Sequence, residues 1–216
     1  LGVKLSKNNN IIIANDDLIN QFGLSGENIL EAVNETHHFL SEIDGKLKSI
    51  GAGRISEVLE LANLSSVIGN IFGASIAKYS RGVFMRNGPH KYPDLLSQQV
   101  VFEDIEIKIA LEKNKPKGHL PKPGVYLIAR YVLVFDGQSF IQNSRGSTPK
   151  IWEVRLGRLA MEHFNLSNTA GDSGKTAVIN KTGMESLAPV YVDLENCPYS
   201  KTSPTFQTYN NLVNNT

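Results

Sequence analysis

The sequence lacks the features that identify several large classes of protein. It contains one cysteine among 216 residues, Cys197, so neither an internal disulfide nor a thiolate zinc site can form within it. It has no apolar run near the roughly 20 residues that cross a bilayer. Residues 1–10 lack the apolar stretch of a secretory signal. These absences predict a soluble, cytoplasmic protein that does not interact with membranes.

The sequence also lacks an overall excess of charge of either sign. With 22 basic and 21 acidic residues, its formal net charge of +1 gives no whole-molecule attraction to polyanions. The basic residues are nevertheless unevenly placed. Over residues 108–130 only one acid, Glu112, accompanies the basic side chains Lys108, Lys113, Lys115, Lys117, Lys122 and Arg130. Such a segment suits a phosphate backbone, and a solvated loop explains it equally well.

The length suits one domain, and its first third predicts helices. Apolar residues recur at helical spacing over residues 15–49 and again over 55–78, and Ser25 is a suitable N-cap within the first segment. Glycines and prolines in residues 81–93 then exclude further helix. Residues 1–80 should therefore be mainly helical.

Strand patterns follow in the middle of the chain. Residues 100–111 alternate between β-branched and polar side chains, and residues 125–135 form an apolar run typical of a buried central strand. We expect a further helix over residues 152–164 and a last strand over 190–194. The sequence thus predicts an α/β (α+β) domain, with a central mixed β-sheet flanked by helices.

A row of charged side chains occupies one face of the first expected strand. Because successive side chains of a strand point to opposite faces, Asp104, Glu106 and Lys108 share one face and the intervening isoleucines share the other. Upstream, a turn presents another carboxylate, Asp94, which a neighbouring strand would bring beside this row. An amphipathic surface strand with its charges in water explains the same pattern.

Phosphodiester hydrolysis needs the groups that this row supplies. Mg²⁺ takes oxygen ligands at roughly 2.0–2.1 Å and keeps several waters, so two carboxylates and a substrate phosphate can hold it. We expect Asp94 and Glu106 to bind Mg²⁺, with the Ile107 carbonyl as a candidate third ligand. We expect Lys108 to orient the attacking water and to neutralise charge on the phosphate.

The order of these residues resembles the PD-(D/E)xK motif of restriction-endonuclease-like nucleases, with Pro93-Asp94, a spacer, and then Glu106-Ile107-Lys108. The resemblance implies a restriction-endonuclease-like core within a single nuclease domain. Members of this superfamily commonly have a further acidic residue in the active site, from the helix that precedes the motif, and Glu57 or Glu60 could match it. The extra acid Asp104 departs from the minimal motif, so the sequence leaves open whether Asp94 or Asp104 binds the metal.

The resemblance also implies a division of the chain and a substrate. Residues 81–136 would form the catalytic sheet core, and residues 137–216 would hold DNA-recognition and C-terminal elements. A chain of this length resembles the type II restriction endonucleases, which cleave double-stranded DNA at specific sequences as homodimers. A DNA repair or junction nuclease of the same fold is an alternative. The candidate DNA-binding residues are Lys113, Lys115, Lys117, His119, Arg145, Lys175, Asn180 and Lys181.

Two further interpretations belong to other classes of protein. Residues 171–174 resemble the nucleophile turn of chymotrypsin-like proteases, which would make the chain a serine hydrolase with Ser173 as its nucleophile. The same stretch fails as a nucleotide-binding loop, because Thr169 stands where the first glycine is needed, so we expect no nucleotide cofactor. A non-catalytic DNA-binding protein would use only the basic segment.

Overall fold

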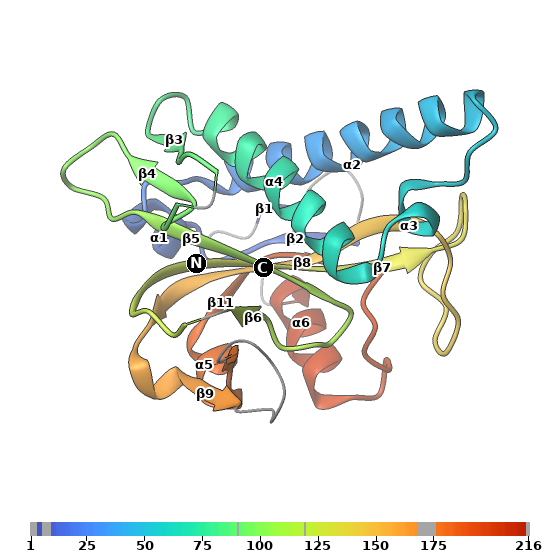
Figure 1. The fold of residues 1–216 in the computed structure, drawn as a ribbon. Coiled ribbons are helices and arrows are strands. Elements are labelled where there is room, and N and C mark those ends of the chain that lie inside the picture. The colour runs from blue at the N-terminus through green and yellow to red at the C-terminus, as the bar shows by residue number, and fades with distance from the viewer. Residues whose placement is uncertain (1–3, 6–9, 90, 119, 168–175, 215–216) are drawn as a thin grey trace.

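The computed structural model of the chain describes residues 4–5, 10–89, 91–118, 120–167 and 176–214. At its centre is an eight-stranded sheet in the order β1-β2-β11-β8-β7-β5-β4-β3. The pair of β5 and β7 is parallel, whereas the other neighbouring strands are antiparallel. Helices α2 and α4 cover one face, and α5 and α6 lie on the other (Figure 1). This arrangement confirms a mixed α/β domain with a central mixed sheet.

The main sheet consists of β1 (Lys4–Leu5), β2 (Ile11–Ile13), β3 (Phe84–Arg86), β4 (Leu95–Ser97), β5 (Ile105–Leu111), β7 (Gly124–Val134), β8 (Thr148–Leu159) and β11 (Ala188–Asp193). A second sheet joins β6 (Lys117–Gly118), β10 (Thr176–Ile179) and β9 (Phe164–Ser167). The helices are α1 (Asp16–Gln21), α2 (Gly26–Ser49), α3 (Ile55–Val58), α4 (Leu61–Tyr79), α5 (Lys181–Ser186), α6 (Pro204–Asn214) and the short 3₁₀-helix η1 (Met161–His163).

The N-terminal part is mainly helical, as predicted, but each expected helix is interrupted. The first breaks at Gly23, whose φ of 76° is a left-handed conformation that favours glycine. Helix α2 then begins after Ser25, whose hydroxyl accepts a hydrogen bond from the Asn28 N–H, while the Asn28 side chain accepts one from the Ser25 N–H. This reciprocal cap confirms Ser25 as the N-cap. The second expected helix is split into α3 and α4 by the extended backbone at Leu59 and Glu60.

The sheet core is buried between the helical layers. Every residue of β7 from Val125 to Val134 is buried, which confirms the central strand expected from the apolar run. Apolar side chains of α2 and α4, including Ile29, Ile68 and Phe72, pack with those of β5 and β7 in one continuous core. The strand expected over residues 100–111 begins only at Ile105.

The helix expected over residues 152–164 is absent, and the prediction was wrong. Most of that segment belongs to β8, which lies between β7 and β11 in the sheet. Residues 152–156 alternate apolar and charged side chains, which is a strand pattern that the helix prediction overlooked. Both sets are largely covered in the fold, since Trp152, Val154, Leu156 and the charged Glu153 are all buried. The sheet is therefore not confined to residues 81–136, since residues 137–216 contribute β8 and β11.

Within the described parts of the chain, no helix is both long enough and apolar enough to cross a membrane.

Candidate active site

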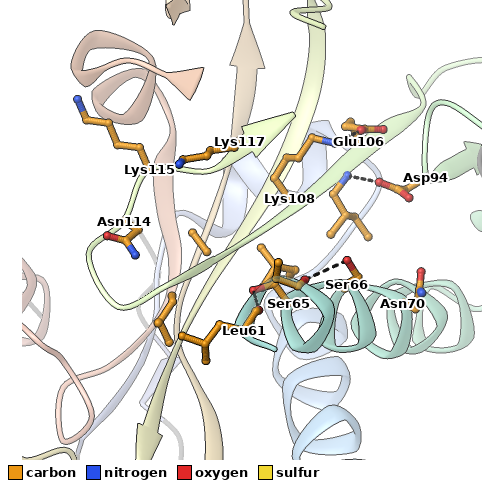
Figure 2. Close-up of a pocket in the computed structure, with 16 residues that line it drawn as sticks. Leu61, Ser65, Ser66, Asn70, Asp94, Glu106, Lys108, Asn114, Lys115 and Lys117 are labelled. Atoms are coloured by element: carbon orange, nitrogen blue, oxygen red, sulfur yellow. Dashed lines mark hydrogen bonds and ion pairs between the residues drawn. The ribbon is translucent and has the colours of Figure 1, made fainter. Parts of the chain in front are cut away.

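A pocket of about 650 Å³ lies along the edge of β5. Strand β4 pairs with β5 only through Leu95 and Ile105. Beyond Ile105, this edge of β5 is therefore not paired with β4. Helix α4 forms one wall of the pocket, and the segment from Asn114 to Lys117 forms another (Figure 2). The pocket is therefore bounded by a helix on one side and a basic segment on the other.

Asp94 lies at the mouth of this pocket, immediately before β4. Its Oδ2 accepts a hydrogen bond from the backbone N–H of Ile107 at 2.9 Å. Its Oδ1 lies 3.3 Å from Nη1 of Arg86 on β3. The side chain keeps 29% of its surface exposed. The β3–β4 hairpin thus carries a partly accessible carboxylate to the edge of β5.

Glu106 and Lys108 project from the same face of β5, as the strand periodicity predicted, and their side chains form an ion pair (Figure 2). Only 9% of the Glu106 side chain is exposed, whereas the Lys108 side chain is 26% exposed. Burial raises the pKa of Glu106, the attraction of Lys108 opposes this effect, and the negative charge of Asp94 raises the pKa further. Glu106 is therefore a buried carboxylate under repulsion from a second carboxylate, a situation that a bound cation would relieve.

The oxygen atoms at this edge suit a hard cation. The N–H of Ile107 points toward Asp94, and a strand residue directs its N–H and its carbonyl to the same edge, so the Ile107 carbonyl faces the same side. Among the described residues no cluster of three or more His, Cys, Asp or Glu side chains could hold a metal. Mg²⁺ is nevertheless commonly held by one or two carboxylates, with waters and substrate phosphate as its other ligands.

Asp104 does not line the pocket, although its spacing of two residues from Glu106 predicted that it would share a strand face with Glu106 and Lys108. It lies just before β5, is exposed, and accepts a hydrogen bond from the Ser97 N–H at 2.8 Å through its Oδ1. Its carboxylate therefore closes the turn between β4 and β5. Of the two acids that the sequence left open, the structure places Asp94 in the pocket.

The helix acids expected from the resemblance are also placed elsewhere. Glu57 accepts a hydrogen bond from the Arg54 N–H at 2.7 Å and so caps α3. Glu60 is the exposed N-cap residue of α4. Neither residue lines the pocket, where α4 instead presents Ser65, Ser66 and Asn70. The prediction of Glu57 or Glu60 as a metal ligand is thus wrong for this structure, because the helix breaks between them and turns its polar face of serine and asparagine to the pocket.

The basic segment is divided among several environments. Lys115 and Lys117 line the pocket. Lys113 and Arg145 instead line a second hollow of about 500 Å³, where Arg145 Nη2 lies 3.0 Å from Glu112 Oε1. Arg130 is not available to a phosphate backbone, because it is buried in an ion pair with Glu153 and stacks on Trp152. Fewer of the basic side chains of residues 108–130 are therefore accessible to a phosphate backbone than the sequence suggested.

The other candidate DNA contacts lie on the C-terminal elements or outside the described residues. Asn180 caps α5, since its Oδ1 accepts from the Gly183 N–H at 2.8 Å and its Nδ2 donates to the Glu162 carbonyl at 2.7 Å. Its side chain therefore caps the helix, and its assignment to DNA stays a prediction. Lys181 is exposed, with Nζ 3.7 Å from Glu185. His119, Lys175 and the Ser173 turn lie outside the described residues.

Sequence reasoning missed Arg86, Asn70 and Asn114. Arg86 contacts Asp94, and the other two line the pocket. Nothing in a single sequence signals them, because each reaches the site through the packing of β3, α4 or the segment before β6. Comparison with protein-family models, with curated proteins and with solved structures finds no match to this chain, so its geometry alone carries the functional argument.

Proposed function

We propose that the chain is a Mg²⁺-dependent endonuclease that cleaves double-stranded DNA at a specific sequence, in the manner of a type II restriction endonuclease. The observation that carries the proposal is the meeting of Asp94, Glu106 and Lys108 at one pocket. Lys115 and Lys117 line the same pocket, where they would contact the phosphates of the substrate.

The chemistry would divide among these side chains. Bound Mg²⁺ would polarise the scissile phosphate and lower the pKa of a water. Asp94 and Glu106 would hold the cation, with the Ile107 carbonyl beside them. The Lys108 ammonium, now paired with Glu106, would orient the attacking water and offset the negative charge that builds on the phosphate oxygens.

The second hollow supports recognition of bases. Gln142, Asn143 and Arg145 line it, and their amide and guanidinium groups are suited to bidentate contacts with adenine and guanine. Glu112, which pairs with Arg145, has a φ of 53°. A non-glycine residue there costs on the order of 1 kcal/mol, and the Glu112 carboxylate lies 3.0 Å from the Arg145 guanidinium, which it would help to orient. We propose that Arg145 reads a base, and that two copies of the chain cut the two strands.

Supercoiled plasmid tests the proposal, with Asp104→Asn as the matched control. Asparagine at 104 keeps an oxygen for the Ser97 N–H, so this variant should cleave like the native protein. Glu106→Gln and Lys108→Met should each lose at least about 100-fold in rate, as removal of a group that stabilises the transition state typically does. Salt-sensitive DNA binding without nicking in Mg²⁺ would show a non-catalytic DNA-binding protein instead. Cleavage confined to branched DNA would show a junction nuclease.

A further inference from the structure

Arg86 connects helix α4 to the carboxylate of Asp94. Its Nη1 lies 3.2 Å from the Asp94 carbonyl oxygen and 3.3 Å from Asp94 Oδ1. Its Nη2 donates to Asn70 Oδ1 on α4 at 3.1 Å. The planar guanidinium therefore bridges the helix and the hairpin that carries Asp94, which a single ammonium could not do with the same geometry.

The helix makes room for this guanidinium at Gly73. A Cβ atom there would lie 2.6 Å from Nη1 and 3.1 Å from Cζ of Arg86, and 3.0 Å from Cδ1 of Ile107. Any side chain larger than hydrogen would thus displace the Arg86 head group or its neighbour. Glycine in a helix interior costs about 1 kcal/mol relative to alanine, and here it permits the close approach of Arg86.

The hydrogen bonds to Asp94 come from two independent elements. The Ile107 N–H of β5 holds Oδ2, and Arg86 of β3 holds Oδ1, so the plane of the carboxylate is fixed from both sides. Asp94 still lines the pocket with part of its surface exposed. No acid of α4 lines the pocket, and the helix instead acts on Asp94 through Asn70 and Arg86.

We propose that Arg86 is a positioning residue that orients Asp94 for a divalent cation. The proposal rests on the function proposed above, because it takes Asp94 as a metal ligand. Two effects of Arg86 oppose each other: its charge repels a cation, and its hydrogen bonds fix the carboxylate in one orientation. The inference is that orientation outweighs repulsion. Loss of a partner that orients a metal ligand typically lowers metal affinity about 10–100-fold.

Calorimetric titration with Mn²⁺ in place of Mg²⁺ measures this affinity without DNA or catalysis. Arg86→Met removes the charge and the hydrogen bonds, Arg86→Lys keeps the charge but loses the bridge, and Gly73→Ala displaces the guanidinium while keeping both residues. All three should bind Mn²⁺ at least about 10-fold more weakly than the native protein. Gly45→Ala is the matched control, since a Cβ at this α2 glycine meets nothing within 4 Å, and it should bind like the native protein.

The outcomes separate this inference from the proposed function. If the native protein binds no Mn²⁺, the metal site itself is wrong and the role of Arg86 falls with it. If the native protein binds Mn²⁺ and the three variants bind as tightly or more tightly, Asp94 does not need Arg86 and only the positioning role is overturned. Thermal unfolding of each variant identifies any that is misfolded. If Arg86→Met is misfolded, Arg86→Lys and Gly73→Ala decide the question.

Discussion

The buried ion pairs around Glu153 give a stability prediction that the structure allows us to size. Glu153 has 1% of its side chain exposed and lies between Arg130, which is 5% exposed, and Arg155. It also accepts a hydrogen bond from the Tyr209 hydroxyl, and Arg155 donates in turn to the carbonyls of Met184 and Leu187. Glu153 therefore connects β7, β8 and α6, and Arg155 extends the network to α5.

Glu153→Gln would leave the buried Arg130 and the partly buried Arg155 without their counter-charge. Removing one partner of a buried ion pair costs about 3–5 kcal/mol. In a chain of this size that cost lowers the melting temperature by on the order of 10 °C. The control is Glu103→Gln, which breaks the pair of Glu103 with Arg158, whose side chains are 52% and 58% exposed. An exposed pair contributes at most about 1 kcal/mol, so this variant should melt within about 4 °C of the native protein.

Thermal unfolding followed by circular dichroism, and urea unfolding at neutral pH, measure both variants. Burial of the charges, not the mere presence of an arginine–carboxylate pair, should set the loss of stability. Equal losses of stability in Glu153→Gln and Glu103→Gln would refute it, and so would a native-like melting temperature for Glu153→Gln.

Three further predictions concern pH and specificity. Burial, with the charge of Lys150 adding to it, lowers the pKa of His37 from 6.5 to about 3, so the unfolded chain binds this proton more readily. The free energy of unfolding should therefore fall as pH drops below 6.5, by at most about 2 kcal/mol between pH 7 and pH 5, because the ring is partly exposed. Urea unfolding should show a shallower pH dependence of stability in His37→Gln than in the native protein. An unchanged pH dependence would contradict this prediction. Lys108 opposes the raised pKa of Glu106, so in Lys108→Met the loss of Mn²⁺ binding on acidification should begin at higher pH, and an unshifted profile would contradict the coupling. Glu112→Gly should relieve the left-handed strain at residue 112, so this variant should melt no lower than the native protein. It should also relax the DNA sequence preference, measured by cleavage of randomised substrates. Unchanged specificity would show that the Glu112–Arg145 pair has no part in base recognition.

The features that the sequence predicted correctly depend on local periodicity. Glu106 and Lys108 share a face because they are two residues apart on a strand, and the apolar run of β7 suffices to place it in the core. Ser25 was identifiable as an N-cap because capping depends on neighbouring residues. Each of these predictions needs only a short stretch of chain.

The features that the sequence could not predict depend on packing between distant segments. The choice between Asp94 and Asp104 is made by the pairing of Leu95 with Ile105, which leaves Asp104 in the turn. The burial of Glu153 on β8 depends on Arg130 of β7 and Tyr209 of α6, which are distant in the sequence. The alternation of residues 152–156 was itself a local strand signal, which the helix prediction overlooked. Arg86 acts across three elements, and no local pattern in the sequence signals such contacts.

Digestion of a DNA of known sequence in Mg²⁺ shows whether the chain is a site-specific, metal-dependent nuclease. We expect discrete fragments whose ends map to one recurring sequence, produced by the native protein and by Asp104→Asn but not by Glu106→Gln. Chelation of the metal should abolish the fragments. The absence of cleavage by the native protein, or the same fragments from Glu106→Gln, would contradict the proposed function.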